Sequence, residues 1–165
     1  MNVLILCTGN SARSILAEAL LNAMANGRVR AYSAGSMPTG KVNPLALEVL
    51  TMEGIPIDGL SSKSWDAFSG PDAPAMDLII TVCDNAAGEA CPIWPGAPLR
   101  AHWGLPDPAA VEGPDEVRLK AFLDTAQALR KRFARLLGLS EAVLADPAAL
   151  QTTLDSIGHM AEGTA

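Results

Sequence analysis

The chain has no long apolar run, although 49% of its 165 residues are hydrophobic. A membrane-spanning helix needs about 18 or more consecutive apolar residues, so we expect no membrane protein. The first ten residues, MNVLILCTGN, have no basic leader, and their apolar stretch covers only residues 3–6. That stretch is too short for a signal peptide. These absences predict a cytoplasmic protein.

Basic residues are also scarce, with 12 Lys and Arg against 18 Asp and Glu, which gives a net charge of −6. Such a charge repels nucleic acids and anionic membrane surfaces, so we expect neither as a partner. An anionic substrate would need a site where positive charge is concentrated locally.

Cysteine is rare as well, with three residues in the whole chain. An odd number without a leader argues against a disulfide framework and favours reduced, reactive thiols. A chain of this length buries a core without disulfides or a structural metal. We therefore expect a single compact enzyme domain, and we predict no cofactor and no bound metal.

Strand-like and helix-like segments alternate along the chain, which predicts an α/β sandwich. The expected strands are residues 2–6, 28–33, 78–82 and 100–103, and the expected helices are residues 14–25, 43–53, 116–137 and 147–157. We divide the chain into a catalytic domain, residues 1–138, and a C-terminal helical extension, residues 139–165, to which the sequence assigns no role.

The long helix at residues 116–137 is amphipathic, with an apolar face that should cover the sheet. Its predicted inward residues are Leu119, Phe122, Leu123, Ala126, Phe133 and Leu137, and Arg and Lys residues cluster near its C-terminal end. Residues 83–115 are rich in Pro, Gly and Ala, which predicts surface loop around the strand at 100–103.

Cys7 and Arg13 stand six positions apart in Cys-Thr-Gly-Asn-Ser-Ala-Arg, between an expected strand and an expected helix. A short loop that leads into a helix N-terminus can turn several backbone N–H groups inward. Gly9 and Asn10 tolerate the left-handed backbone that such a loop needs. The segment predicts an oxyanion-binding loop made of Thr8, Gly9, Asn10, Ser11, Ala12, Arg13 and Ser14.

Arg13 is suited to close this loop over an oxyanion, because a guanidinium donates two parallel hydrogen bonds. The helix N-terminus and Arg13 should also lower the pKa of Cys7 and leave it as a thiolate at neutral pH. Ser14 has two possible roles, as a donor to that sulfur or as a helix cap. A buried cysteine with an unrelated surface arginine is the simpler alternative, but the strand, Gly-Asn and helix context favours the loop.

The loop sequence resembles that of low-molecular-weight protein tyrosine phosphatases and of the arsenate reductases that share their fold. Further segments are similar to the reductases, and together they cover roughly residues 1–137: Ala17-Glu18, Tyr32-Ser33-Ala34-Gly35, Val42-Asn43-Pro44, Thr81-Val82-Cys83, Cys91-Pro92, His102-Trp103-Gly104 and Asp107-Pro108. The resemblance implies a three-layer α/β sandwich with a four-stranded parallel sheet flanked by helices.

Cys83 ends an expected strand, and Cys91 follows after seven residues that include small ones and Gly88. Such a segment has few apolar anchors, so a disulfide that needs loop movement is feasible. Resemblance to thioredoxin-coupled reductases implies a relay from Cys7 to Cys83 and then to Cys91. A structural Cys83 with a chance surface Cys91 is one alternative. Metal binding by both with His102 is another, with weak support.

Asp107 lies between two prolines in Leu-Pro-Asp-Pro, a stiff loop that can present a carboxylate to the oxyanion. We take Asp107 as the general acid that protonates the leaving oxygen. An Asp before Pro is also a common turn residue, and only the resemblance ranks Asp107 above Asp115 or Asp84.

Some relatives bind potassium near the first helix, and Asn10, Glu18, Ser33 and Ser61 match part of that ligand set. Lys63 stands where an acidic ligand would be expected. Its ammonium group is suited to replace the cation by pairing with Glu18.

Reduction of arsenate to arsenite for detoxification is therefore the predicted reaction, in a monomer with thioredoxin or glutaredoxin as reductant. Hydrolysis of phosphate monoesters is the first alternative, because the same loop and acid suit a phosphoryl group. However, Tyr32 is the single tyrosine, so the aromatic rim of a phosphotyrosine pocket is missing. A non-catalytic oxyanion- or metalloid-binding module is the second alternative.

Overall fold

The computed structural model describes residues 1–83 and 98–159. Residues 84–97 and 160–165 lie outside this description, and Cys91, Asp84 and Gly88 fall among them. No helix in the described part is long and apolar enough to cross a membrane.

Four parallel strands form one sheet in the order β2-β1-β3-β4. The strands are β1 (Asn2–Leu6), β2 (Arg30–Ala34), β3 (Leu78–Thr81) and β4 (Leu99–His102). The central strands β1 and β3 are nearly uninterrupted apolar runs, as expected for strands covered on both faces. The α/β class and the four-stranded parallel sheet predicted from the sequence are confirmed.

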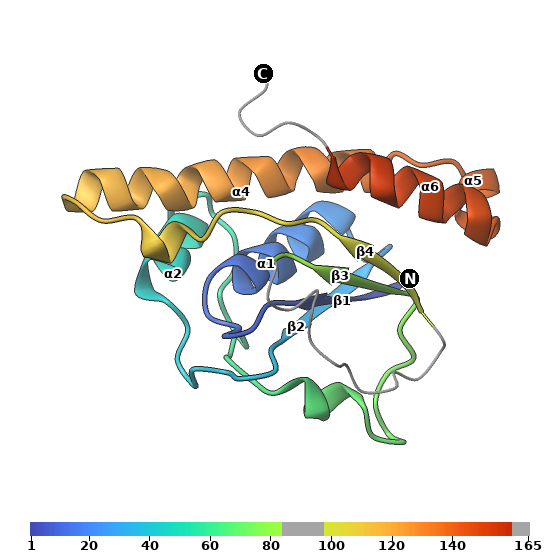
Figure 1. Cartoon of the computed structure of the whole chain (residues 1–165), viewed down its shortest axis with the longest axis horizontal. Coiled ribbons are helices and arrows are strands. Elements are labelled where there is room, and N and C mark those ends of the chain that lie inside the picture. The colour runs from blue at the N-terminus through green and yellow to red at the C-terminus, as the bar shows by residue number, and fades with distance from the viewer. Residues whose placement is uncertain (84–97, 160–165) are drawn as a thin grey trace.

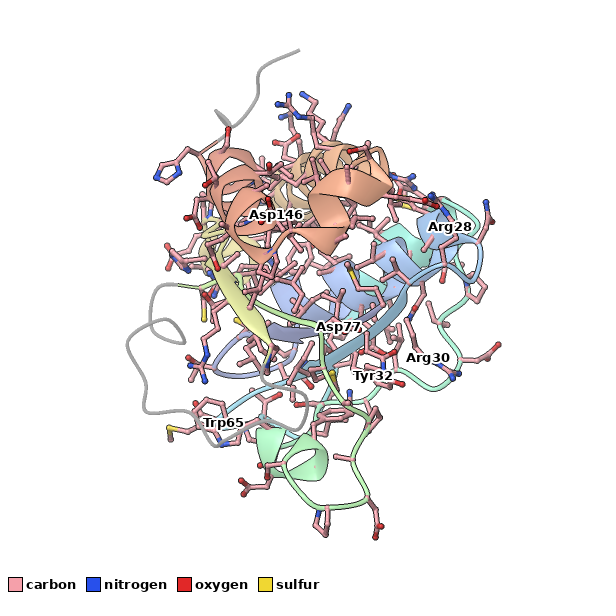
Figure 2. All side chains as sticks on the ribbon, turned by 90° about the vertical axis from the view of Figure 1, so that its right-hand side faces the viewer. Arg28, Arg30, Tyr32, Trp65, Asp77 and Asp146 are labelled. Carbon is pink, nitrogen blue, oxygen red and sulfur yellow. The ribbon has the colours of Figure 1, made fainter. Side chains whose placement is uncertain are left out.

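Helices cover one face of the sheet, where Figure 1 shows α1, α4 and α6 together. The helices are α1 (Arg13–Ala25), α2 (Pro44–Met52), α4 (Asp115–Leu137), α5 (Glu141–Ala145) and α6 (Pro147–Gly158). The short 3₁₀ helix η1 (Trp65–Phe68) lies on the other face. In Figure 2, Trp65 and Asp146 accordingly stand on opposite sides of the sheet.

Strand β2 shows how alternate side chains meet these two layers. The Tyr32 ring packs against Phe68 of η1, with 5.3 Å between the ring centroids. The next residue, Ser33, donates a hydrogen bond to Glu18 of α1 on the opposite face. Strand β2 begins two residues later than predicted, because Asn26 and Gly27 take left-handed backbone conformations after α1.

Helix α4 packs its apolar face on α1, α2 and α6. Its buried residues are Phe122, Thr125, Ala126, Leu129, Arg132, Phe133 and Leu136. Leu119, Leu123 and Leu137, which were predicted to point inward, are only partly buried at the margin of the core. Arg132 is 3% exposed. The Arg and Lys cluster predicted near the C-terminal end of this helix therefore includes a buried member.

The C-terminal segment packs on the edge strand of the sheet. Helix α6 lies against β4 and buries Leu150, Leu154 and Ile157 in the common core. The short helix α5 before it was not predicted. The indole N–H of Trp103 donates a hydrogen bond to the Leu154 carbonyl at 3.0 Å. The segment that follows β4 is thus fixed partly by the C-terminal helix.

Candidate active site

The candidate site lies where the carboxyl ends of β1 and β3 come side by side. Leu6 of β1 pairs with Thr81 of β3, and Val82 N donates to Leu6 O at 3.0 Å. Cys7 directly follows β1, and Cys83 follows β3 after Val82. In open parallel sheets, this carboxyl edge is where ligands usually bind.

Asn10 organises the loop between Cys7 and α1, and its side chain is completely buried. Its amide nitrogen donates to Ser14 Oγ at 2.8 Å and to Ser33 Oγ at 3.0 Å, while its amide oxygen accepts from Lys63 N at 2.9 Å. Asn10 has the predicted left-handed backbone, with φ of 45°. Gly9 does not share it, since it is absent from the residues with positive φ.

The loop is also held from outside through its own carbonyl groups. Thr8 O accepts from Met37 N, Gly9 O accepts from Thr39 N, and Ser11 O accepts from Asn43 N, at 2.9 to 3.0 Å. The Ser62 hydroxyl donates to Gly9 O at 3.1 Å. Two separate segments, residues 35–43 and 62–63, therefore fix the shape of the loop.

Gly35 lies in direct contact with the loop backbone. A Cβ atom at this position would stand 2.4 Å from Cys7 O and 2.3 Å from Thr8 O. Real Cβ atoms do not come so close to backbone, so only glycine fits without displacing the loop. The close approach gives a physical reason for the Gly in the Tyr-Ser-Ala-Gly segment.

Arg13 and Asp107 are brought together by the fold, as predicted. Arg13 Nη2 lies 3.8 Å from Asp107 Oδ2, and Arg13 Nη1 donates to Leu105 O at 2.9 Å. Arg13 Nε is buried and has no hydrogen-bond partner within residues 1–83 and 98–159. A buried guanidinium N–H without a partner is costly, so it favours an anion as ligand.

Asp107 is the more exposed member of this pair, with 44% of its side chain accessible. Its Oδ1 accepts from Ala109 N at 2.9 Å, which caps the short 3₁₀ helix η2 (Pro108–Ala110). The cap holds the carboxylate in place, and the second oxygen faces Arg13.

Cys7 and Cys83 are both buried, at 6% and 4% exposure, and their thiols share a hydrogen bond. Thr8 N also donates to Cys83 Sγ at 3.3 Å. The hydrogen bond with Cys83 and burial raise the pKa of the Cys7 thiol far above its ordinary value. They outweigh Arg13 and the Gly9 N–H, which lower that pKa.

The sequence predicted a Cys7 thiolate at neutral pH, and in this arrangement burial and Cys83 oppose that ionisation. That prediction considered Arg13 and the helix N-terminus but had no means of placing Cys83 against the sulfur. Two thiols that share a hydrogen bond titrate as a pair, so the proton on Cys7 depends on where Cys83 lies.

Ser14 does not have the capping role considered for it, and its role as a donor to the Cys7 sulfur stays a prediction. Helix α1 begins after Ala12 without a side-chain cap, and the Ser14 hydroxyl accepts the hydrogen bond from Asn10. Ser14 therefore supports the loop through its hydrogen bond with Asn10.

Glu18 and Lys63 form the predicted ion pair at the back of the loop. Lys63 Nζ lies 3.7 Å from Glu18 Oε1 and donates to Ser61 O at 2.9 Å. Burial lowers the pKa of the Lys63 ammonium, whereas Glu18 raises it. Through Ser33 and Asn10, this ion pair joins the network under the oxyanion loop.

Comparison with known proteins agrees with this geometry. The sequence profile described as low molecular weight phosphotyrosine protein phosphatase matches residues 2–150. The chain belongs to this family. The arsenate reductase of Halalkalibacterium halodurans is 37% identical over 127 residues, which cover 77% of this chain and 88% of that protein.

Solved structures of the family superpose on most of the chain. The arsenate reductase from Archaeoglobus fulgidus is 28% identical with a TM-score of 0.64, over 83% of this chain and 99% of that one. The thioredoxin-dependent arsenate reductase of Corynebacterium glutamicum is 28% identical with a TM-score of 0.56, over 81% and 60% of the two chains. The resemblance stated from the motifs is confirmed.

Several residues that shape this member of the family were not found from the sequence. Ser62 and the backbone of Lys63 bond to the loop, and Arg132 bonds to the segment before Asp107. A serine in a polar loop and an arginine in an Arg/Lys run carry no local signal of these contacts. The alternative of a metal site formed by Cys83, Cys91 and His102 includes Cys91, which lies outside the described residues.

Proposed function

We propose that this protein reduces arsenate to arsenite, with Cys7 as the nucleophile and Cys83 and Cys91 as the thiols of a disulfide relay. Arsenate reductases are its relatives at 37% identity over most of the chain. The placement of Cys83 beside the Cys7 loop, where Thr8 N donates to Cys83 Sγ at 3.3 Å, carries the proposal, because ester hydrolysis needs one thiol and arsenate reduction needs a second.

Arsenate binds in the loop formed by residues 8–14, in the place where Arg13 Nε lacks a partner. Arg13 has the geometry to reach an oxygen of the anion while Nη1 stays bonded to Leu105 O. The positive charge that the acidic chain needs for an anion is thereby supplied at one point.

In the first step, the Cys7 sulfur attacks arsenic and forms an S–As bond, while its thiol proton passes to an oxygen of the bound anion. One arsenate oxygen leaves as water, with a proton from Asp107, which stands 3.8 Å from Arg13. Hydroxide is a poor leaving group, so a positioned acid accelerates this step by about 10²- to 10⁴-fold.

In the second step, the Cys83 thiolate attacks the Cys7 sulfur. The S–As bond breaks, its electron pair stays on arsenic, and As(V) leaves as As(III) in arsenite. The two sulfurs are oxidised to a Cys7–Cys83 disulfide. Because Cys7 and Cys83 follow paired strands and Thr8 N already donates to Cys83 Sγ at 3.3 Å, this step needs no large movement of β1 or β3.

In the third step, the Cys91 thiolate attacks Cys83, forms Cys83–Cys91 and releases Cys7 as a thiolate. An external dithiol, thioredoxin or glutaredoxin, then reduces Cys83–Cys91 and becomes a disulfide itself. The sum is arsenate plus a dithiol, giving arsenite, a disulfide and water.

The test is arsenate-dependent NADPH oxidation by the purified protein with thioredoxin and thioredoxin reductase, beside a parallel glutaredoxin system. Sustained turnover in one system supports the proposal and names the reductant. Absence of turnover in both, together with hydrolysis of an aryl phosphate, contradicts it.

A Cys91→Ser variant tests the relay itself. The variant should form one equivalent of arsenite and then stop as a Cys7–Cys83 disulfide, which mass spectrometry of the non-reduced peptides identifies. Full multiple turnover of this variant with thioredoxin would exclude a three-cysteine relay.

Hydrolysis of phosphate monoesters is the second candidate, because the facing pair of Arg13 and Asp107 suits a phosphoryl group equally well. It would proceed through Cys7 and Asp107 without Cys83. The Cys83→Ala variant therefore separates the two activities, since it should lose arsenate reduction and keep aryl phosphate hydrolysis.

A further inference from the structure

Helix α4 contributes an arginine that is almost completely buried, Arg132, with 3% exposure. Its Nη1 group donates to Trp103 O at 3.1 Å and to Gly104 O at 3.5 Å. A buried cation is tolerated only where polar groups compensate its charge. Here, carbonyl groups of the segment between β4 and Asp107 are among the groups that do so.

The same segment is held by a second arginine on its next carbonyl. Arg13 Nη1 donates to Leu105 O at 2.9 Å. Three successive carbonyls, from Trp103 to Leu105, therefore accept hydrogen bonds from two guanidinium groups. The backbone N–H groups of this segment bond to the end of β3: Trp103 N donates to Thr81 O, and Leu105 N donates to Val82 O.

The Trp103 ring is fixed as firmly as its backbone. It is fully buried, lies 6.0 Å from the Phe133 ring of α4, and bonds through its indole N–H to α6. Gly158 of α6 packs closely on the ring, since a Cβ there would stand 2.8 Å from Trp103 Cδ1. The carbonyls that Arg132 contacts therefore belong to a rigid anchor.

Beyond this anchor, the chain reaches Asp107 within two residues of Leu105, and Pro106 limits the freedom of that step. The Asp107 carboxylate itself is 44% exposed and touches Arg13 at only 3.8 Å. Its position therefore depends on the cap from Ala109 N and on the backbone before it.

We propose that Arg132 is a positioning residue for the general acid: it holds the carbonyls of Trp103 and Gly104 so that Asp107 faces the oxyanion loop. This inference rests on the proposed function, because it acts through the acid role of Asp107. A lysine does not replace it, since an ammonium lacks the planar fork and the reach of a guanidinium.

The inference predicts a separation of rate from binding. The oxyanion loop is fixed by Asn10, Ser62 and Lys63, none of which contacts Arg132. Loss of Arg132 should therefore lower kcat and leave KM for arsenate nearly unchanged. A displacement of about 1 Å in a reacting group can cost up to about 100-fold in rate.

The decisive experiment is a double-mutant cycle of Arg132→Lys with Asp107→Asn, read as kcat and KM for arsenate. We expect Arg132→Lys to lower kcat about tenfold in the parent protein and to have no further effect when Asp107 is already Asn. Arg135→Lys, the same substitution on an exposed position of α4, is the matched control and should not change kcat.

Urea unfolding of every variant checks that it folds. Arg132→Met is a second variant, which keeps a long side chain but has no hydrogen-bond donors. A purely structural role of Arg132 predicts that kcat falls equally in the parent and in the Asp107→Asn protein, and that result overturns the inference. An unchanged kcat in both Arg132→Lys and Arg132→Met overturns it as well. Full activity of Asp107→Asn alone would instead refute the proposed acid. Should the parent act only on aryl phosphate, the same cycle is read on that reaction.

Discussion

The oxyanion loop and the segment that carries Asp107 face each other, yet they are built differently. The loop rests on a buried side-chain network, in which Asn10, Ser14 and Ser33 are all fully buried. The acid segment is held by its backbone carbonyls, and its carboxylate stays 44% exposed.

This difference matches two separate roles in the proposed reaction, oxyanion binding by the loop and proton transfer by the acid segment. A rigid, buried loop suits the binding of an oxyanion, whose geometry does not change much before attack. A carboxylate that accepts and returns protons needs contact with water, and the exposed Asp107 has it. Perturbing the loop should therefore damage binding and the nucleophile, whereas perturbing the acid segment should damage the proton transfer.

The strongest test of the comparison removes the nucleophile from the loop side. Cys7→Ser should abolish both arsenate reduction and aryl phosphate hydrolysis, because an alcohol at this position is a far weaker nucleophile. The two assays described above measure this. Residual turnover in either assay would place its nucleophile elsewhere.

On the acid side, Asp107→Asn should lower kcat for arsenate by about 10²- to 10⁴-fold while KM changes little. The amide keeps the size of the side chain but cannot donate the proton. Steady-state kinetics with the coupled reductant measures the effect. If KM rises and kcat is preserved, Asp107 serves substrate binding and not proton transfer.

A third test concerns the Cys83 contact that raises the pKa of Cys7. In Cys83→Ala, burial still raises that pKa, but the largest raising cause is gone while Arg13 remains. The pKa of Cys7 should fall, and each unit of decrease raises the thiolate fraction about tenfold at a pH below that pKa.

The measurement is the rate of Cys7 alkylation against pH, in a Cys91→Ser background and followed by mass spectrometry. The parent should react only at alkaline pH, and the Cys83→Ala variant should react at lower pH. Identical profiles would mean that Cys83 does not control the ionisation of Cys7.

The smallest effect is expected behind the loop, at the pair of Lys63 and Glu18. Lys63→Gln should cost about 1 kcal/mol of unfolding free energy, because the pair is only partly buried. Urea unfolding in potassium chloride and in sodium chloride measures this loss of unfolding free energy. Comparison of the two salts tests whether a potassium ion can take the place of the Lys63 ammonium. Stabilisation of the variant alone by potassium would support that replacement.

The sequence was most informative where structure follows from local pattern. Strand β1 has its predicted bounds, since an apolar run next to a Gly-Asn loop has few other conformations. Helix α2 begins at Pro44 after Asn43, whose side chain accepts from Leu45 N, as the Asn-Pro pair suggests. The oxyanion loop was recognised for the same reason, because all its parts are adjacent.

Contacts between distant residues were harder to predict. Arg13 and Leu105 are 92 positions apart, so only a family resemblance pointed to Asp107. The position of Cys83 against Cys7 depends on the order of strands in the sheet, which no local pattern records. Arg132 was missed because a charged residue within an Arg/Lys run reads as solvent-exposed.

Gly35 gives this site an unusual intolerance of change. Any side chain at position 35 would meet the carbonyl oxygens of Cys7 and Thr8, so every other residue type would displace the loop that carries Cys7. A library of all substitutions at position 35, selected for growth on arsenate, would therefore be expected to return glycine alone. Substitution is expected to be easier at Gly70, where a Cβ would meet open space and the backbone is not left-handed.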